Sequence, residues 1–166
     1  SAAILKVFES WYSPRAKMYR QEMNISDDWG TAVIVQNMVF GNLNDRSGSG
    51  VVFTRSPKGL STSISLYGDF IFGCQGDDIV SGLTETFPIS EAQRKTEARK
   101  SSISLEVHFP EIFKELNRMI DILIYERGFN HKEIEFTFES DVKEGLYILQ
   151  SRDIVMLSPE KINTWL

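Results

Sequence analysis

The sequence predicts an α+β fold, in which helices and strands occupy separate stretches of the chain. Residues 133–139 and 147–152 alternate apolar and polar side chains with the period of a β-strand. Before them, one stretch repeats apolar residues at the spacing of an amphipathic helix, namely Ile112, Phe113, Leu116, Met119, Ile120 and Leu123. Because the two patterns are segregated, we expect a mixed, mostly antiparallel sheet with flanking helices.

The N-terminal stretch predicts two helices. Residues 2–11 carry apolar side chains at helical spacing, and Pro14 is well placed to open a second helix with residues 16–23 as its body. Residues 31–40 are rich in Val and Ile and are expected to form a buried strand. Residues 41–50, rich in Gly, Asn, Ser and Asp, are expected to form a loop.

Further strands are expected at residues 51–54, 63–67 and 69–74. Residues 90–104 are polar and charged, which fits a surface helix or a mobile loop. Residues 110–127 form the clearest helix, and Gly128 is well placed as its C-cap. The polar residues 140–145 end in Gly, so the two final strands are predicted to form an antiparallel hairpin.

The hairpin gathers polar groups on one strip. If Glu139 pairs with Leu146, then Glu135 lies opposite Gln150 and Glu133 lies opposite Arg152. Carboxylate and amide oxygens suit Mg²⁺, and Arg suits a phosphate. The alternative is a solvated hairpin face with one cross-strand ion pair, and spacing alone favours that alternative.

Composition limits the classes of protein. The 166 residues suffice for one core, and 42% hydrophobic with 25% charged residues indicates a globular chain. A net charge of −5 argues against a general nucleic-acid or anionic-membrane binder. The single Cys74 allows no internal disulfide, which fits a reducing cytosol, so we expect a cytoplasmic protein. No apolar run reaches the roughly 20 residues of a membrane span. The chain begins directly in a helical pattern, which suggests a piece of a larger protein.

Three other stretches have alternative interpretations. Residues 36–41 end at a Gly and can offer backbone groups to a flat base, with Met38 and Phe40 as apolar walls, or they are a core strand running into a turn. Residues 47–50 can cradle an anion or form a flexible hairpin loop, since they lack the Lys of a P-loop. Arg55 suits a phosphate or an ordinary surface position.

Nucleophile candidates are weak. Cys74 lies in an apolar run, and His108 and His131 lack the spacing of a metal site or a catalytic triad. This pattern suits a domain that positions phosphates and metal, where catalysis depends on alignment and electrostatics.

Seven stretches of the sequence occur in the same order as in a known protein family. The stretches are residues 10–20 (with Ser-Trp, Pro-Arg-Ala and Tyr-Arg), 28–33 (Asp-Trp-Gly-Thr-Ala-Val), 36–42 (Gln-Asn-Met-Val-Phe-Gly-Asn), 47–55 (Ser-Gly-Ser-Gly-Val-Val-Phe-Thr-Arg), 75–80 (Gln-Gly-Asp-Asp-Ile-Val), 133–137 (Glu-Ile-Glu-Phe-Thr) and 149–152 (Leu-Gln-Ser-Arg). Over residues 1–155 the sequence resembles the N-terminal ATP-binding region of the pyruvate, phosphate dikinase family, which also includes phosphoenolpyruvate synthase.

The resemblance implies an ATP-grasp fold, in which two α+β subdomains hold ATP between them. This chain is similar to most of one subdomain, over residues 1–157, with 158–166 as a tail or the start of a linker. The implied site comprises Gln36, Met38 and Val39 around adenine, Glu135 and Gln150 for Mg²⁺ and polyphosphate, Glu133 where the family has Asp, and Arg152 as the catalytic group on a terminal phosphate. These implied roles favour the functional interpretation of the hairpin strip.

The implied reaction is that of a phosphotransferase. Mg-ATP phosphorylates a carrier His on another domain, and pyruvate and phosphate become phosphoenolpyruvate, AMP and pyrophosphate. The implied partners are a first ATP-grasp subdomain, the phosphohistidine domain and, in the whole enzyme, pyruvate and phosphate, with a homodimeric parent as one arrangement. We expect neither nucleic acid nor membrane as a partner, and no turnover by the chain alone.

Departures from the family pattern keep alternatives open. Asp69 stands where Glu is usual, Ser151 replaces Thr, and residues 72–74 and 87–104 differ from the family. A non-catalytic nucleotide-binding or regulatory module is one alternative. A phosphoenolpyruvate synthase-type dikinase with a different acceptor is another.

Overall fold

The computed structural model describes residues 1–56, 64–75, 85–98 and 103–154. The chain divides into two compact units, residues 1–38 and residues 39–166. The tail expected at residues 158–166 lies outside the described residues. In the described part of the chain, no helix is long and apolar enough to cross a membrane.

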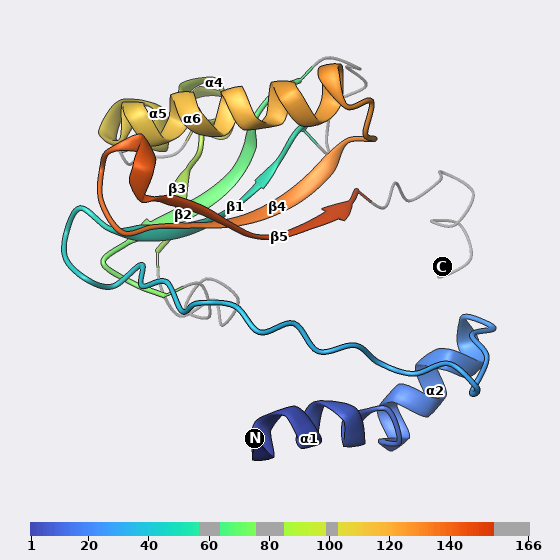
Figure 1. Ribbon diagram of the computed structural model, residues 1–166. Coiled ribbons are helices and arrows are strands. Elements are labelled where there is room, and N and C mark those ends of the chain that lie inside the picture. The colour runs from blue at the N-terminus through green and yellow to red at the C-terminus, as the bar shows by residue number, and fades with distance from the viewer. Residues whose placement is uncertain (57–63, 76–84, 99–102, 155–166) are drawn as a thin grey trace. The chain divides into compact units, whose positions relative to one another are not determined.

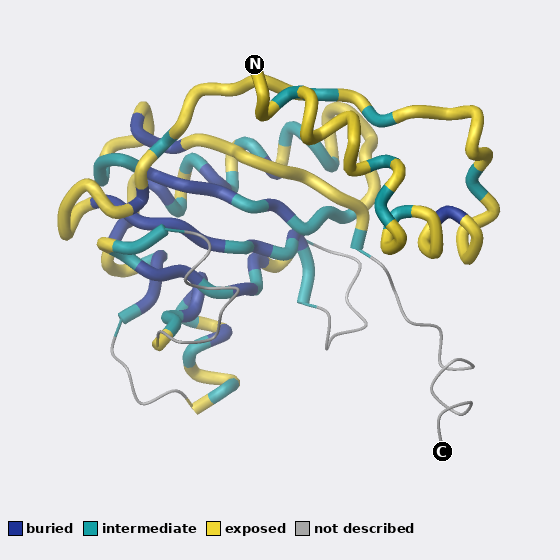
Figure 2. The backbone as a smooth tube through the Cα atoms, turned by 90° about the horizontal axis from the view of Figure 1, so that it is seen from below, coloured by how far each residue is buried: buried dark blue, intermediate teal, exposed yellow. Residues whose placement is uncertain are grey.

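The first unit contains the two predicted helices, α1 (Ala2–Ser10) and α2 (Pro14–Glu22). The side chain of Ser13 caps α2 by accepting from the Ala16 N–H at 3.2 Å. The buried side chain of this unit is charged: Arg20 is 4% exposed. Its Nε donates to Asp27 Oδ1 at 2.7 Å, and its Nη1 donates to the Trp11 carbonyl at 2.6 Å. Polar bonds, rather than an apolar core, therefore organise this unit (Figure 2).

The prediction of a buried strand at residues 31–40 is wrong. Ile34, Val35 and Met38 are 85%, 81% and 70% exposed, and no part of the segment is a strand. β-branched residues favour a strand only where a neighbouring strand and a packed face are available. Among the described strand pairs, none includes this segment.

The second unit is built on a five-stranded antiparallel sheet with the order β3-β2-β1-β4-β5. The strands are β1 (Gly48–Phe53), β2 (Tyr67–Phe72), β3 (Phe87–Pro88), β4 (Lys132–Phe138) and β5 (Leu146–Asp153). The predicted α+β class and the final hairpin are confirmed. The strands expected at 63–67 and 69–74 are replaced by β2 alone in the described residues.

Two helices of this unit, α5 (Leu105–His108) and α6 (Pro110–Asp121), cover one face of the sheet (Figure 1). A third helix, α4 (Glu91–Thr96), packs beside the edge strand β3. The predicted long helix is α6 extended by a π-helical turn, Ile122–Glu126. Gly128 follows with φ +68°, the left-handed conformation expected of a helix end. Of the stretch 90–104, the first part is helical, and residues 99–102 lie outside the described residues.

The core lies between these helices and the sheet. Its fully buried members include Val52, Phe70, Ile112, Leu116, Ile120, Ile134, Phe136 and Phe138. On β1 the small residues Gly48 and Gly50 lie under two phenyl rings. A Cβ on Gly50 would lie 2.4 Å from Phe136 Cζ, and one on Gly48 would lie 2.6 Å from Phe138 Cζ.

This packing overturns both interpretations of residues 47–50. Gly48, Ser49 and Gly50 belong to the central strand β1 and pair with β2 on one side and β4 on the other. They form neither a flexible loop nor a free nest of N–H groups, because the ladders on both sides engage the backbone.

Candidate functional site

We call the face of the sheet opposite α5 and α6 the helix-free face. By strand alternation it carries Tyr67, Asp69 and Ile71 of β2, Ser49, Val51 and Phe53 of β1, Glu133, Glu135 and Thr137 of β4, and Gln150 and Arg152 of β5. The cross-strand row Asp69–Val51–Glu135–Gln150 lies beside the row Tyr67–Phe53–Glu133–Arg152. The predicted strip of hairpin polar groups is therefore present.

The register of the hairpin differs from the premise of the prediction. Leu146 pairs with Phe138, not with Glu139, and the Glu139 N–H instead donates to the Gly145 carbonyl at 3.0 Å. A β-bulge between Glu135 and Phe136 then shifts the register by one residue. Beyond the bulge, Glu135 lies opposite Gln150 and Glu133 opposite Arg152, as predicted.

An ion pair joins the two ends of the strip. Arg152 Nη2 donates to Glu133 Oε1 at 2.5 Å, with the arginine side chain 58% and the glutamate side chain 17% exposed. The hydrogen bond and the charge of Glu133, with a further contribution from the charge of Glu135, raise the pKa of Arg152 above its ordinary value. Arg152 is thus a permanently charged group at the surface, suited to meet a phosphate.

Glu135 and Gln150 provide one carboxylate and one amide oxygen on neighbouring strands. Residues directly opposite each other place their Cβ atoms about 5 Å apart, so both side chains can reach one ion. Within the described residues, no cluster of three or more His, Cys, Asp or Glu side chains suits a metal. This donor set fits Mg²⁺, which usually keeps waters and takes phosphate oxygens beside one or two carboxylates. It does not fit a cation caged by protein alone.

The residues expected around adenine fall on either side of the boundary between the units. Gln36 and Met38 belong to the first unit and are exposed, whereas Val39 belongs to the second and is half-buried. The structure therefore places Val39 in the same unit as the hairpin and does not place Gln36 or Met38 relative to it.

Two side chains that the sequence reasoning did not assign reach this boundary. Glu139 Oε1 accepts from the Phe40 N–H at 2.9 Å, and Gln75 Oε1 accepts from the Gly41 N–H at 3.2 Å. The alternation of residues 133–139 already placed Glu139 on the face of Glu133 and Glu135, so a signal existed for it. Gln75 begins one of the seven resembling stretches, residues 75–80, but its residue type and spacing indicate no role.

A buried pair of hydroxyls lies on the same face. Ser49 Oγ and Thr137 Oγ1 are 2.9 Å apart, and the two residues are 1% and 2% exposed. Each satisfies the other in a place that water does not reach, as buried polar groups require. They are parts of the sheet and supply no group to a ligand.

Arg55 and the two histidines are weaker candidates for a binding site. Arg55 lies two residues after the end of β1 and is half-buried, and its Nε has no hydrogen-bond partner within the described residues. His131 Nδ1 lies 2.9 Å from Thr54 Oγ1, and the His108 ring stacks on Phe72 with 5.5 Å between centroids. Both histidine side chains therefore make contacts within the protein.

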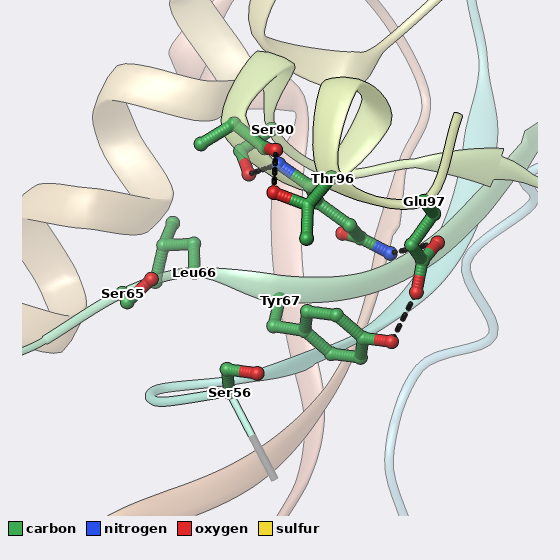
Figure 3. Close-up of a pocket in the computed structure, with 9 residues that line it drawn as sticks. Ser56, Ser65, Leu66, Tyr67, Ser90, Thr96 and Glu97 are labelled. Atoms are coloured by element: carbon green, nitrogen blue, oxygen red, sulfur yellow. Dashed lines mark hydrogen bonds between the residues drawn. The ribbon is translucent and has the colours of Figure 1, made fainter. Parts of the chain in front are cut away.

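A cavity of about 500 Å³ lies between α4 and the start of β2 (Figure 3). It is lined by Ser56, Ser65, Leu66, Tyr67, Ser90, Ala92, Gln93, Thr96 and Glu97. Its polar groups serve the fold: Gln93 Oε1 accepts from the Gly68 and Ile89 N–H groups at 3.0 and 3.3 Å, and the Tyr67 hydroxyl bonds Glu97. We therefore place the candidate site on the hairpin strip.

Comparison with known proteins identifies the family of the chain. Residues 1–164 match the family described as "Pyruvate phosphate dikinase, AMP/ATP-binding domain". The chain is 43% identical over 151 residues to the pyruvate, phosphate dikinase of Rickettsia conorii, covering 91% of this chain and 16% of that protein. The corresponding enzymes of Rhizobium meliloti and Clostridium symbiosum are 42% and 39% identical, over 90% and 91% of this chain and 16% and 15% of theirs.

The chain therefore spans about 16% of the length of such relatives. The ATP-grasp assignment is consistent with this family, and the resemblance found in the sequence motifs is confirmed. The match over residues 1–164 shows that the chain belongs to the pyruvate phosphate dikinase AMP/ATP-binding domain family.

Proposed function

We propose that this chain supplies part of the ATP-binding cleft of a pyruvate, phosphate dikinase-type phosphotransferase. The observation that carries the proposal is the pairing of Glu135 with Gln150 beside the Glu133–Arg152 ion pair on the helix-free face. Such a strip combines oxygen donors for a cation with a cation for a phosphate, which is what Mg-ATP requires.

In this proposal each side chain has a separate task. Glu135 and Gln150 hold Mg²⁺ and orient the polyphosphate. Arg152 is the catalytic residue: it exchanges its bond with Glu133 for one with a terminal phosphate and stabilises charge that develops during transfer. Gln36, Met38 and Val39 border the adenine. Bound Mg²⁺ would neutralise phosphate charge and align the phosphate oxygens.

The other parts of the reaction belong to segments of the relatives that this chain does not span. These are the first ATP-grasp subdomain, the phosphohistidine carrier, and the part that acts on pyruvate and phosphate. We therefore expect the 166-residue chain to bind nucleotide without turning it over. Measurable conversion of ATP to AMP by the purified chain would contradict this expectation.

The test is an amide NMR titration of the chain with a non-hydrolysable ATP analogue, with and without Mg²⁺. We expect shifts at Glu135, Gln150 and Arg152 and at residues 36–41, larger when Mg²⁺ is present. Shifts confined to other residues, or none at millimolar ligand, would reject the proposed site.

A neighbouring ion pair provides a matched control. Lys132 Nζ and Asp153 Oδ1 are 2.5 Å apart, one step along the hairpin from Glu133 and Arg152. We expect Arg152→Gln and Gln150→Ala to weaken the titration by at least tenfold, and Asp153→Asn to leave it within twofold. Because the three substitutions affect the net charge differently, equal losses in all of them would point to a general disturbance of the hairpin and not to the strip.

A further inference from the structure

Two side chains that are distant in the sequence hold the start of the second unit. The Phe40 N–H donates to Glu139 Oε1 at 2.9 Å, and the next N–H, that of Gly41, donates to Gln75 Oε1 at 3.2 Å. Glu139 directly follows β4, and Gln75 lies three residues after the end of β2. Two consecutive backbone donors are thus bound by side chains from two different strand ends.

The same segment is held at its carbonyl and by close packing. Ser47, fully buried, donates from Oγ to the Gly41 carbonyl at 2.9 Å. A Cβ at Gly41 would lie 2.3 Å from Ser49 Oγ and 2.6 Å from the Cys74 carbonyl oxygen, so no larger residue fits. Phe40 and Gly41 are therefore held in place beside Ser49 of the helix-free face, and Val39 directly precedes them.

We propose that Glu139 and Gln75 are positioning residues that fix residues 39–41 for the nucleotide base, and so set the base-dependent part of nucleotide affinity. The inference rests on the proposed function, which assigns Met38 and Val39 to the adenine. The two hydrogen bonds use the N–H groups of Phe40 and Gly41. Neither of them involves the backbone groups of Met38 or Val39. A base edge is recognised by such backbone groups, and holding them in advance lowers the ordering cost of binding.

The experiment separates the base from the phosphates. The 166-residue chain is titrated with a Mg-bound ATP analogue, with AMP and with Mg-tripolyphosphate, which has no base. Glu139→Met and Gln75→Met remove the acceptor at similar length, whereas Glu139→Gln keeps an acceptor oxygen. Glu144→Gln, an exposed change in the turn before β5, is the control.

We expect Glu139→Met and Gln75→Met each to weaken the ATP analogue and AMP by about 5- to 20-fold, the equivalent of one lost hydrogen bond. Tripolyphosphate binding stays within twofold of wild type, and Glu139→Gln and Glu144→Gln bind all three probes like wild type. Unfolding midpoints and amide spectra identify any variant that fails to fold. If one of the two Met variants does not fold, the other still tests the loss of an acceptor.

Two results would overturn the inference while leaving the proposed function intact. One is unchanged nucleotide affinity in both Met variants, and the other is an equal loss for tripolyphosphate, which would indicate a purely structural role. A wild-type chain that binds none of the three probes would instead reject the proposed function, and the inference with it.

Discussion

The helix-covered and helix-free faces of the sheet are built from alternate residues of the same strands, yet their side chains contribute differently. On β4, Ile134, Phe136 and Phe138 point to the helices and are no more than 1% exposed. Their neighbours Glu133 and Glu135 point the other way and are only half-buried. The first set stabilises the fold, and the second leaves charged groups available for a ligand. The comparison predicts which substitutions change stability and which change binding.

The largest loss of stability is expected from Phe136→Ala. This ring packs over Gly50 in the core, and truncation would cost about 3–5 kcal/mol in the free energy of unfolding, measured by urea denaturation. The comparison substitution Val51→Ala, on the helix-free face and half-buried, would cost about 1 kcal/mol. Similar costs for the two variants would contradict the expectation that the helix-covered face stabilises the fold more than the helix-free face does.

A smaller effect is expected where the helix-free face is itself buried. Ser49→Ala or Thr137→Val leaves one buried hydroxyl without its partner, at a cost of about 1–3 kcal/mol each. In the double variant both polar groups are gone, so its cost should fall well below the sum. An additive double-mutant cycle in urea unfolding would show that the two hydroxyls act independently.

The contacts of Glu91 on α4 are expected to make the stability of the chain depend on pH. Hydrogen bonds from Arg94 and Ser104 lower the pKa of the Glu91 carboxyl from 4.5 to about 2. A lowered carboxyl pKa stabilises the folded chain fully above pH 4.5, and this contribution is lost as the pH falls through about 2. In thermal unfolding across that range, Glu91→Gln should lose less stability on acidification than wild type. Parallel curves for the two chains would exclude the contact as a source of acid sensitivity.

The smallest effect on stability is expected at the ion pair of the site. Arg152 lies on the edge strand β5 with its side chain 58% exposed, and an ion pair with one such exposed partner contributes little to folding. Arg152→Gln should therefore leave the unfolding midpoint unchanged while nucleotide binding weakens by at least tenfold. A large drop in the midpoint would show that the pair is structural.

The sequence predicted those parts of the fold that depend on local pattern. The period of α6, the alternation of β4 and the cap at Gly128 follow from neighbouring residues. The strand expected at 31–40 could not be judged locally, since Val and Ile form a strand only where a partner strand exists. Gly48 and Gly50 were assigned to a loop because their strand role depends on phenyl rings that lie almost 90 residues later in the chain.

The proposed site rests on two different kinds of sequence signal. Glu133, Glu135, Gln150 and Arg152 followed from cross-strand arithmetic together with the family resemblance. The roles proposed for Glu139 and Gln75 depend on backbone donors 99 and 34 positions away, so no local spacing could reveal the contacts.

The β-bulge determines how the polar residues of this hairpin can be copied into another protein. β5 places Leu146 and Ile148 opposite Phe138 and Phe136, and only the extra residue Leu149 turns Gln150 and Arg152 toward Glu135 and Glu133. The outer strand thus has two halves in opposite phase, so packing can be redesigned in one half without re-aiming the other. A graft that copied alternate positions onto a regular hairpin would direct the amide and the guanidinium into the host's core.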